Sequence, residues 1–157
     1  MILTKGRLNA RFARMLRHLE HWGDVEAHDR GASGQLRVFE FQLDTPADGP
    51  TEARAFFQER YERTASAGWE LVQYAYDYVD LDRRWRQAFH LHPIGGPSSI
   101  AHAHCEPGLD LRRDESPRHF RAVEYDLREA NALFMRLYAD GRSPACDELL
   151  PLEIDRG

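Results

Sequence analysis

The chain has 157 residues, of which 42% are hydrophobic and 30% charged, and its formal net charge is -5. These values are typical of one globular domain with a buried core, here residues 1–157, and they exclude wholesale disorder. The negative charge excludes nucleic-acid binding through bulk positive charge, while a local basic face remains open. The two cysteines make no disulfide scaffold. Since there is no signal peptide and no apolar run of about 20 residues, we expect a soluble, cytoplasmic protein that binds no membrane.

The first part of the chain predicts two helices with a hairpin between them. Apolar residues recur at helical spacing over residues 7–22, and Gly23 ends that pattern. Residues 24–45 alternate on both sides of the turn signal GASG, which predicts two antiparallel strands. From Thr51, a favourable N-cap, to Ala67 the apolar residues again recur at helical spacing, so we expect a second helix there.

Residues 69–93 predict a second hairpin. A two-residue turn at Leu81 and Asp82 would set Asp80 opposite Arg83. Alternation along the two strands then yields one mostly apolar face, made of Val72, Tyr74, Tyr76, Tyr78, Trp85, Gln87, Phe89 and Leu91. The other face carries the polar residues Gln73, Asp77, Arg86, His90 and His92. The tyrosine series resembles a stacking platform for bases, but its spacing fits core packing better.

Two further strands and a last helix complete the predicted elements. The strands are expected at residues 99–106 and 118–127. Asp126 and Glu129 have capping-box spacing, an apolar stripe follows them, and Gly141 lies beyond its end. We expect the tail from residue 144 to be irregular. Because hairpins dominate the pattern, the predicted fold class is α+β, an antiparallel sheet of about five or six strands with helices packed on one face.

Four histidines form two His-x-His pairs around the loop PIGGPSSIA. Residues two apart in a strand share a face, so His90 and His92 point to one side, as do His102 and His104. If the two strands pair, His92 is expected opposite His102 and His90 opposite His104, with Cβ atoms about 5 Å apart. Leu91, Ala103 and Cys105 would then face the other way, and Cys105 is excluded as a ligand.

A divalent metal such as zinc fits this geometry. Three histidines and a water molecule would make an open catalytic site, whereas all four histidines would make a closed one. Asp77 lies on the face of His90 and could orient its ring. Glu124, on the next predicted strand, is a further candidate ligand or base.

Two other interpretations stay open. Without a metal, a histidine pair can act as general base and general acid. With Arg84, Arg86 and Arg121 as phosphate ligands it would then cleave a phosphodiester, as a small ribonuclease does. Alternatively the histidines have no function and lie on a solvated strand face.

Residues 70–105 resemble the TumE-type proteins of bacterial toxin–antitoxin loci. The similarity lies in a tyrosine-rich strand, an arginine-bearing return strand and a histidine cluster, at Tyr74, Tyr76, Arg84, Arg86, His90, His92, His102 and His104. This chain departs from the pattern in its two separated His-x-His pairs and its long N-terminal portion. The resemblance implies a prokaryotic toxin-like or defence-associated protein with an antitoxin as partner.

The leading hypothesis is therefore a small bacterial hydrolase of phosphodiesters, with RNA as the substrate. Its catalytic residues would be His90, His92, His102 and His104, with Asp77 and with Arg86 on the phosphate. The alternative is a non-catalytic module that binds a partner protein, in which the histidines are a structural metal site or a solvated face. The oligomeric state is not predicted.

Overall fold

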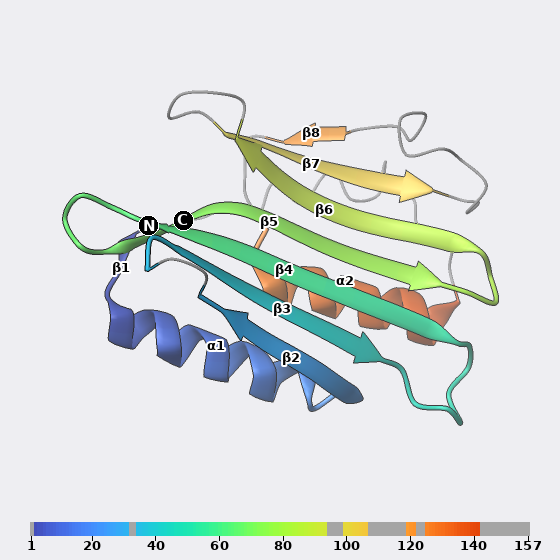
Figure 1. Cartoon of the computed structure of the whole chain (residues 1–157). Helices are drawn as coiled ribbons and strands as arrows, with labels where there is room; N and C mark the ends of the chain where they lie inside the picture. The colour runs from blue at the N-terminus through green and yellow to red at the C-terminus, as the bar shows by residue number, and fades with distance from the viewer. Residues whose placement is uncertain (1, 32–33, 94–98, 107–118, 122–124, 142–157) are drawn as a thin grey trace, which may run out of the picture.

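The structure is a computed structural model, and it describes residues 2–31, 34–93, 99–106, 119–121 and 125–141. Their strands form one antiparallel sheet in the order β2-β3-β4-β5-β6-β7-β8, with β1 paired to the start of β5 (Figure 1). The strands are β1 (Ile2–Leu3), β2 (Asp24–Arg30), β3 (Leu36–Asp44), β4 (Ala53–Arg63), β5 (Trp69–Asp80), β6 (Trp85–Pro93), β7 (Ser99–Glu106) and β8 (His119–Arg121). The predicted α+β class is confirmed, and the sheet has more strands than expected.

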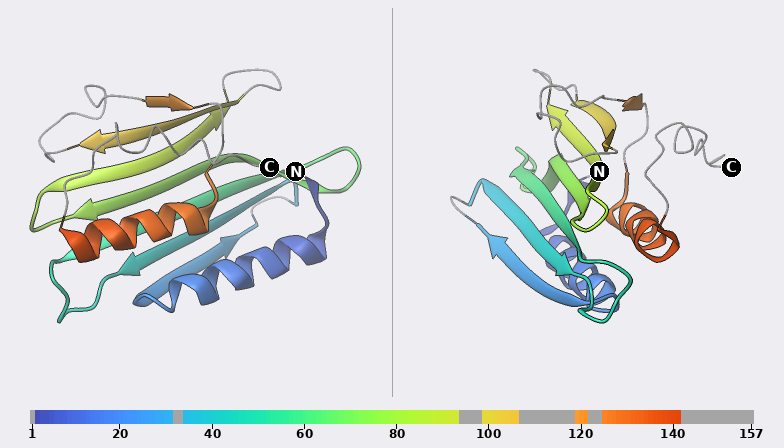
Figure 2. Two further views of the ribbon diagram at one scale, coloured as in Figure 1. Left: turned by 180° about the vertical axis from the view of Figure 1, so that it is seen from behind. Right: turned by 90° about the vertical axis from the view of Figure 1, so that its right-hand side faces the viewer.

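Two helices, α1 (Lys5–Leu19) and α2 (Leu127–Asp140), lie on the same side of this sheet (Figure 2). On α1, Phe12 packs against Phe39 and Phe41 of β3. On α2, Phe134 packs against Phe57 of β4 and against side chains of β5 and β6. No helix of the described residues has the length and apolar character that crossing a membrane requires. Among the described residues, no helix covers the other face of the sheet (Figure 2).

The helix predicted over residues 51–67 is wrong, because this segment forms strand β4. Its buried residues alternate, from Ala53 to Tyr61, as they do in a strand with one covered face. Two side chains hide this alternation in the sequence. Phe56 is 42% exposed although it is large and apolar, and Glu59 is fully buried although it is charged.

Glu59 is buried because it has partners beneath the helices. Both carboxylate oxygens accept hydrogen bonds from the Arg11 guanidinium of α1, one of them at 2.8 Å. The hydroxyls of Tyr61 and Tyr76 donate to the same carboxylate. Burial and the nearby carboxylate raise the pKa of both tyrosines, so both remain donors. A charged residue thus occupies a core position of β4 and joins α1 to the sheet.

The β5–β6 turn has four residues rather than two, so Asp80 pairs with Trp85 instead of Arg83. Asp80 is fully buried and accepts hydrogen bonds from the Arg83 backbone N–H and the Thr51 hydroxyl, both at 2.8 Å. The Arg83 guanidinium also donates to the Leu137 carbonyl at the end of α2. These contacts hold the hairpin register and join the turn to the helix.

The pairing of β6 with β7 also differs from the prediction by two residues. His90 pairs with His102, His92 with Ile100, and His104 with Ala88. The predicted pairs His92–His102 and His90–His104 are therefore wrong. Because both shifts are even, the side chains of β6, of β7 and of residues 74–80 of β5 stay on the face that alternation assigned to them. The register of β4 with β5 shifts between Arg60 and Tyr61, so Leu71, and not the predicted Val72, lies opposite the buried Tyr61 and packs against the core.

The last helix is confirmed. Asp126 and Glu129 form the predicted capping box, and Gly141 ends α2 in the left-handed conformation at φ 65°. The strand predicted at residues 118–127 is seen at His119–Arg121. The tail from residue 144 lies outside the described residues, as does most of the loop between the two His-x-His pairs.

Candidate functional site

The helix-free face of β5, β6 and β7 holds a polar cluster around one small residue, Ala88. Ala88 lies directly opposite Asp77 on β5 and His104 on β7. Its neighbours two positions away on β6, Arg86 and His90, flank it on the same face. Because alanine leaves space between them, the longer side chains of Arg86 and His90 can both reach Asp77 diagonally.

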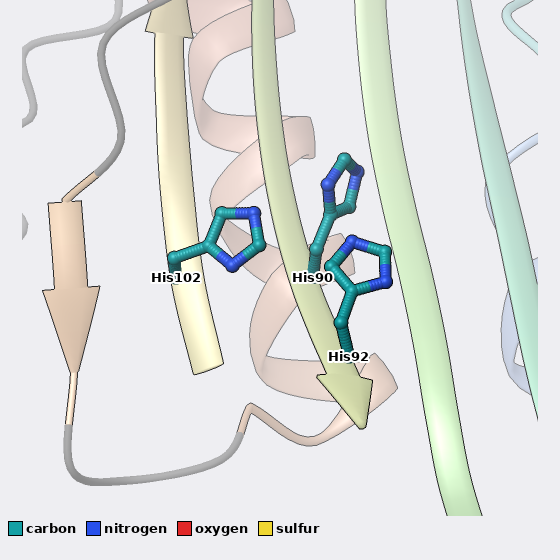
Figure 3. A group of neighbouring side chains, drawn as sticks. All are labelled: His90, His92 and His102. Atoms are coloured by element: carbon teal, nitrogen blue, oxygen red, sulfur yellow. The ribbon is translucent and has the colours of Figure 1, made fainter. Parts of the chain in front are cut away.

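The four histidines meet in this cluster. The ring centroid of His90 lies 5.5 Å from that of His92, 5.4 Å from that of His102 and 5.1 Å from that of His104. The rings of His102 and His104 are 4.8 Å apart. Figure 3 shows His90 and His92 on β6 and His102 on β7, on the opposite side of the sheet from α2. The predicted convergence of the two pairs is therefore seen, although the pairing partners differ.

Three of these residues form a tighter group. The candidate ligand nitrogens of His90, His92 and His102 all lie within 4.8 Å of one another, and His104 is outside this group. Nitrogens on one tetrahedral zinc ion at about 2.0–2.1 Å would lie about 3.3 Å apart. Small side-chain rotations would close the difference. The arrangement thus fits three ligands, with His104 beside them.

The histidines do not lie on a solvated strand face. His102 and His104 are 4% and 5% exposed, and His90 and His92 are partly buried. Leu91, Ala103 and Cys105 point to the helix side and are buried there, as alternation predicts. Cys105 is disulfide-bonded, so it offers no thiolate to the histidine side of the sheet.

Asp77 accepts a hydrogen bond from a neighbouring histidine, as predicted. Its Oδ2 lies 3.0 Å from Nε2 of His90. Burial would raise the pKa of Asp77, but contacts with His90 and Arg86 outweigh burial and hold that pKa below its usual value. Asp77 therefore remains an ionised acceptor at neutral pH. A carboxylate on one imidazole nitrogen is the usual way to orient a metal-binding histidine.

Arg86 contacts carboxylates on both sides, which does not fit its predicted role on a phosphate. Its Nε donates to Asp77 Oδ1 at 2.8 Å, and its Nη2 donates to the same oxygen. Its Nη1 donates to Glu106 Oε1 at 2.8 Å. Burial would lower the pKa of Arg86, but the two carboxylates raise it. Its charge is therefore balanced within the protein.

Glu106 belongs to this cluster and was not predicted. It is 4% exposed and lies opposite Arg86 in the β6–β7 pairing. Alternation could have identified it, since Glu106 follows His104 by two residues on the same strand. Glu124 and the side chain of Arg121 lie outside the described residues, and Arg84 is in the β5–β6 turn at φ 58°.

The tyrosines that carry part of the resemblance lie on the other face of the sheet. The rings of Tyr74 and Tyr76 stack at 4.5 Å, and both residues are buried under the helices. They pack in the core, as their spacing predicts, and do not reach the histidines.

The donor set indicates which metals would fit. Imidazole nitrogens suit zinc and other late first-row transition metals, whereas magnesium and calcium prefer oxygen ligands. The carboxylates of the cluster, Asp77 and Glu106, bond to Arg86 and His90 and are occupied as acceptors.

Comparison of the chain with models of protein families, with curated proteins and with solved structures finds no match.

Proposed function

We propose that this chain is a metal-dependent hydrolase whose metal ion, zinc, is bound by His90, His92 and His102. The observation that carries the proposal is the convergence of three imidazoles from two paired strands, with ligand atoms within 4.8 Å of one another. Zinc with three protein ligands keeps a position for water and lowers the pKa of that water to about 7. The chain's own residues supply the ligands, the orientation of His90 by Asp77 and a largely buried setting.

The substrate class and the partner are the wider part of the proposal. The TumE-type resemblance covers the strands that carry the histidines and supports an antitoxin as partner. A phosphodiester of RNA is proposed as the substrate because a histidine cluster can supply acid–base chemistry for its cleavage. The contacts of Arg86 with Asp77 and Glu106 weigh against its direct use on phosphate. We therefore propose Arg86 as a structural member of the site.

The hydrolase proposal is tested with single-stranded RNA, an activated phosphodiester and an activated ester as substrates. We expect hydrolysis that is lost on chelation and restored by zinc. The rate should fall more than about 100-fold in His102→Ala, because losing even a residue that only hydrogen-bonds to a metal ligand lowers activity about 10- to 100-fold. The matched control is His28→Ala, a half-exposed histidine on β2 of the same sheet.

Each pattern of rates in this experiment has a defined meaning. Cleavage of RNA and the activated phosphodiester alone supports the phosphodiesterase, and cleavage of the ester alone moves the proposal to another substrate class. Hydrolysis unaffected by chelation and by His102→Ala would contradict a metal centre. A zinc-loaded chain inactive on every substrate would favour the non-catalytic module.

A further inference from the structure

We infer that Glu106 and Arg86 position Asp77 so that His90 presents its Nδ1 to the metal. This inference rests on the proposed metal site and adds two positioning residues to it. The contacts form a continuous series from β7 to β5 and back to β6: Glu106 to Arg86, Arg86 to Asp77, and Asp77 to His90.

The hydrogen bond to Asp77 selects the tautomer of His90. An ionised carboxylate can only accept, so Nε2 of His90, 3.0 Å from Asp77 Oδ2, must carry the proton. The lone pair of the neutral ring is then on Nδ1. A metal binds the nitrogen that carries the lone pair, and the partner of the other nitrogen decides which one that is.

Arg86 holds the carboxylate in place for this role. Nε and Nη2 both donate to Oδ1 of Asp77, which leaves Oδ2 for His90. Arg86 in turn is held by Glu106, whose side chain is 6% exposed. Because all these groups are largely buried, solvent competes weakly with each contact.

The tautomer can be measured without any metal. We would record side-chain nitrogen NMR spectra of the metal-free chain at about pH 8, where an ordinary histidine is neutral. Wild-type His90 is expected to be protonated on Nε2. In Asp77→Asn the amide can donate to Nε2, so the proton is expected to move to Nδ1.

The variants Arg86→Lys and Glu106→Gln test the two new residues. Both are expected to leave His90 as a mixture of tautomers and to weaken zinc binding by about 10- to 100-fold, the usual effect of losing a group behind a ligand. Arg30→Lys is the matched control, because Arg30 pairs with Glu40 at 2.8 Å on the exposed edge of the sheet. It is expected to change neither measurement.

The inference fails if wild-type His90 is protonated on Nδ1. It also fails if Arg86→Lys and Glu106→Gln leave both the tautomer and the zinc affinity unchanged. If the tautomer responds as expected but zinc does not bind, the proposed function fails while the positioning role of the two residues holds. The NMR measurement on metal-free protein therefore separates the two proposals.

Discussion

Replacement of His102 by alanine is expected to abolish zinc binding. His102 lies directly opposite His90, is 4% exposed and supplies the β7 member of the three-histidine group. Only His90 and His92 on β6 would remain as ligands, and two histidines do not complete a zinc site. The loss of zinc affinity should therefore exceed the effect of about 10- to 100-fold that follows when a residue hydrogen-bonded to a ligand is lost. Isothermal titration with zinc measures the affinity.

The thermal stability of the same variants provides a second readout. A ligand at 100 times its dissociation constant stabilises the folded state by about 2.7 kcal/mol, so zinc should raise the melting temperature of the wild type. His102→Ala and His92→Ala should lose this shift, and His28→Ala should keep it. His104→Ala separates an open site, which keeps zinc, from a closed site, which does not. Retention of wild-type affinity in His102→Ala would show that the histidines hold no shared ion.

Replacement of Glu59 by alanine is expected to destabilise the fold by about 3–5 kcal/mol, the usual effect of breaking a buried ion pair. The change leaves the largely buried Arg11 guanidinium and the hydroxyls of Tyr61 and Tyr76 without their acceptor. Chemical denaturation monitored by circular dichroism measures the free energy of unfolding.

The matched control for this stability effect is Glu62→Ala on the same strand. Glu62 pairs with Arg60, but both side chains are about half exposed, so the expected change is below about 1 kcal/mol. If Glu59→Ala also changed stability by less than about 1 kcal/mol, the burial and pairing of Glu59 beneath α1 would be contradicted.

Local signals predicted much of the fold. The caps of α2 are encoded within a few residues, at Asp126, Glu129 and Gly141, and the structure confirms them. The prediction of a helix over residues 51–67 was wrong because the strand that forms there contains a buried charged residue. Glu59 takes a core position only because Arg11 and two tyrosines, distant in sequence, surround its carboxylate. No pattern within the segment reveals such partners.

The sequence predicted which residues of the site share one face of the sheet, but not which of them lie opposite one another on neighbouring strands. Alternation places the four histidines, Asp77 and Arg86 on one face of the sheet. A change in turn length that shifts the strand register by an even number of residues does not alter this placement. The turn after Asp80 has four residues because the side chain of Asp80 accepts from the Arg83 backbone and from Thr51. The contact with Thr51 comes from a distant segment, so the β5 residues beside His90 could not be read from the hairpin alone.

The central claim is that three histidines bind one transition-metal ion. X-ray absorption spectroscopy of the chain loaded with one equivalent of zinc counts the imidazoles around the ion directly. We expect three imidazole nitrogens at about 2.0–2.1 Å and one oxygen ligand in the wild type, and no imidazole-bound zinc in His102→Ala. A first shell of oxygen ligands without imidazole, or one of four imidazoles, would contradict it.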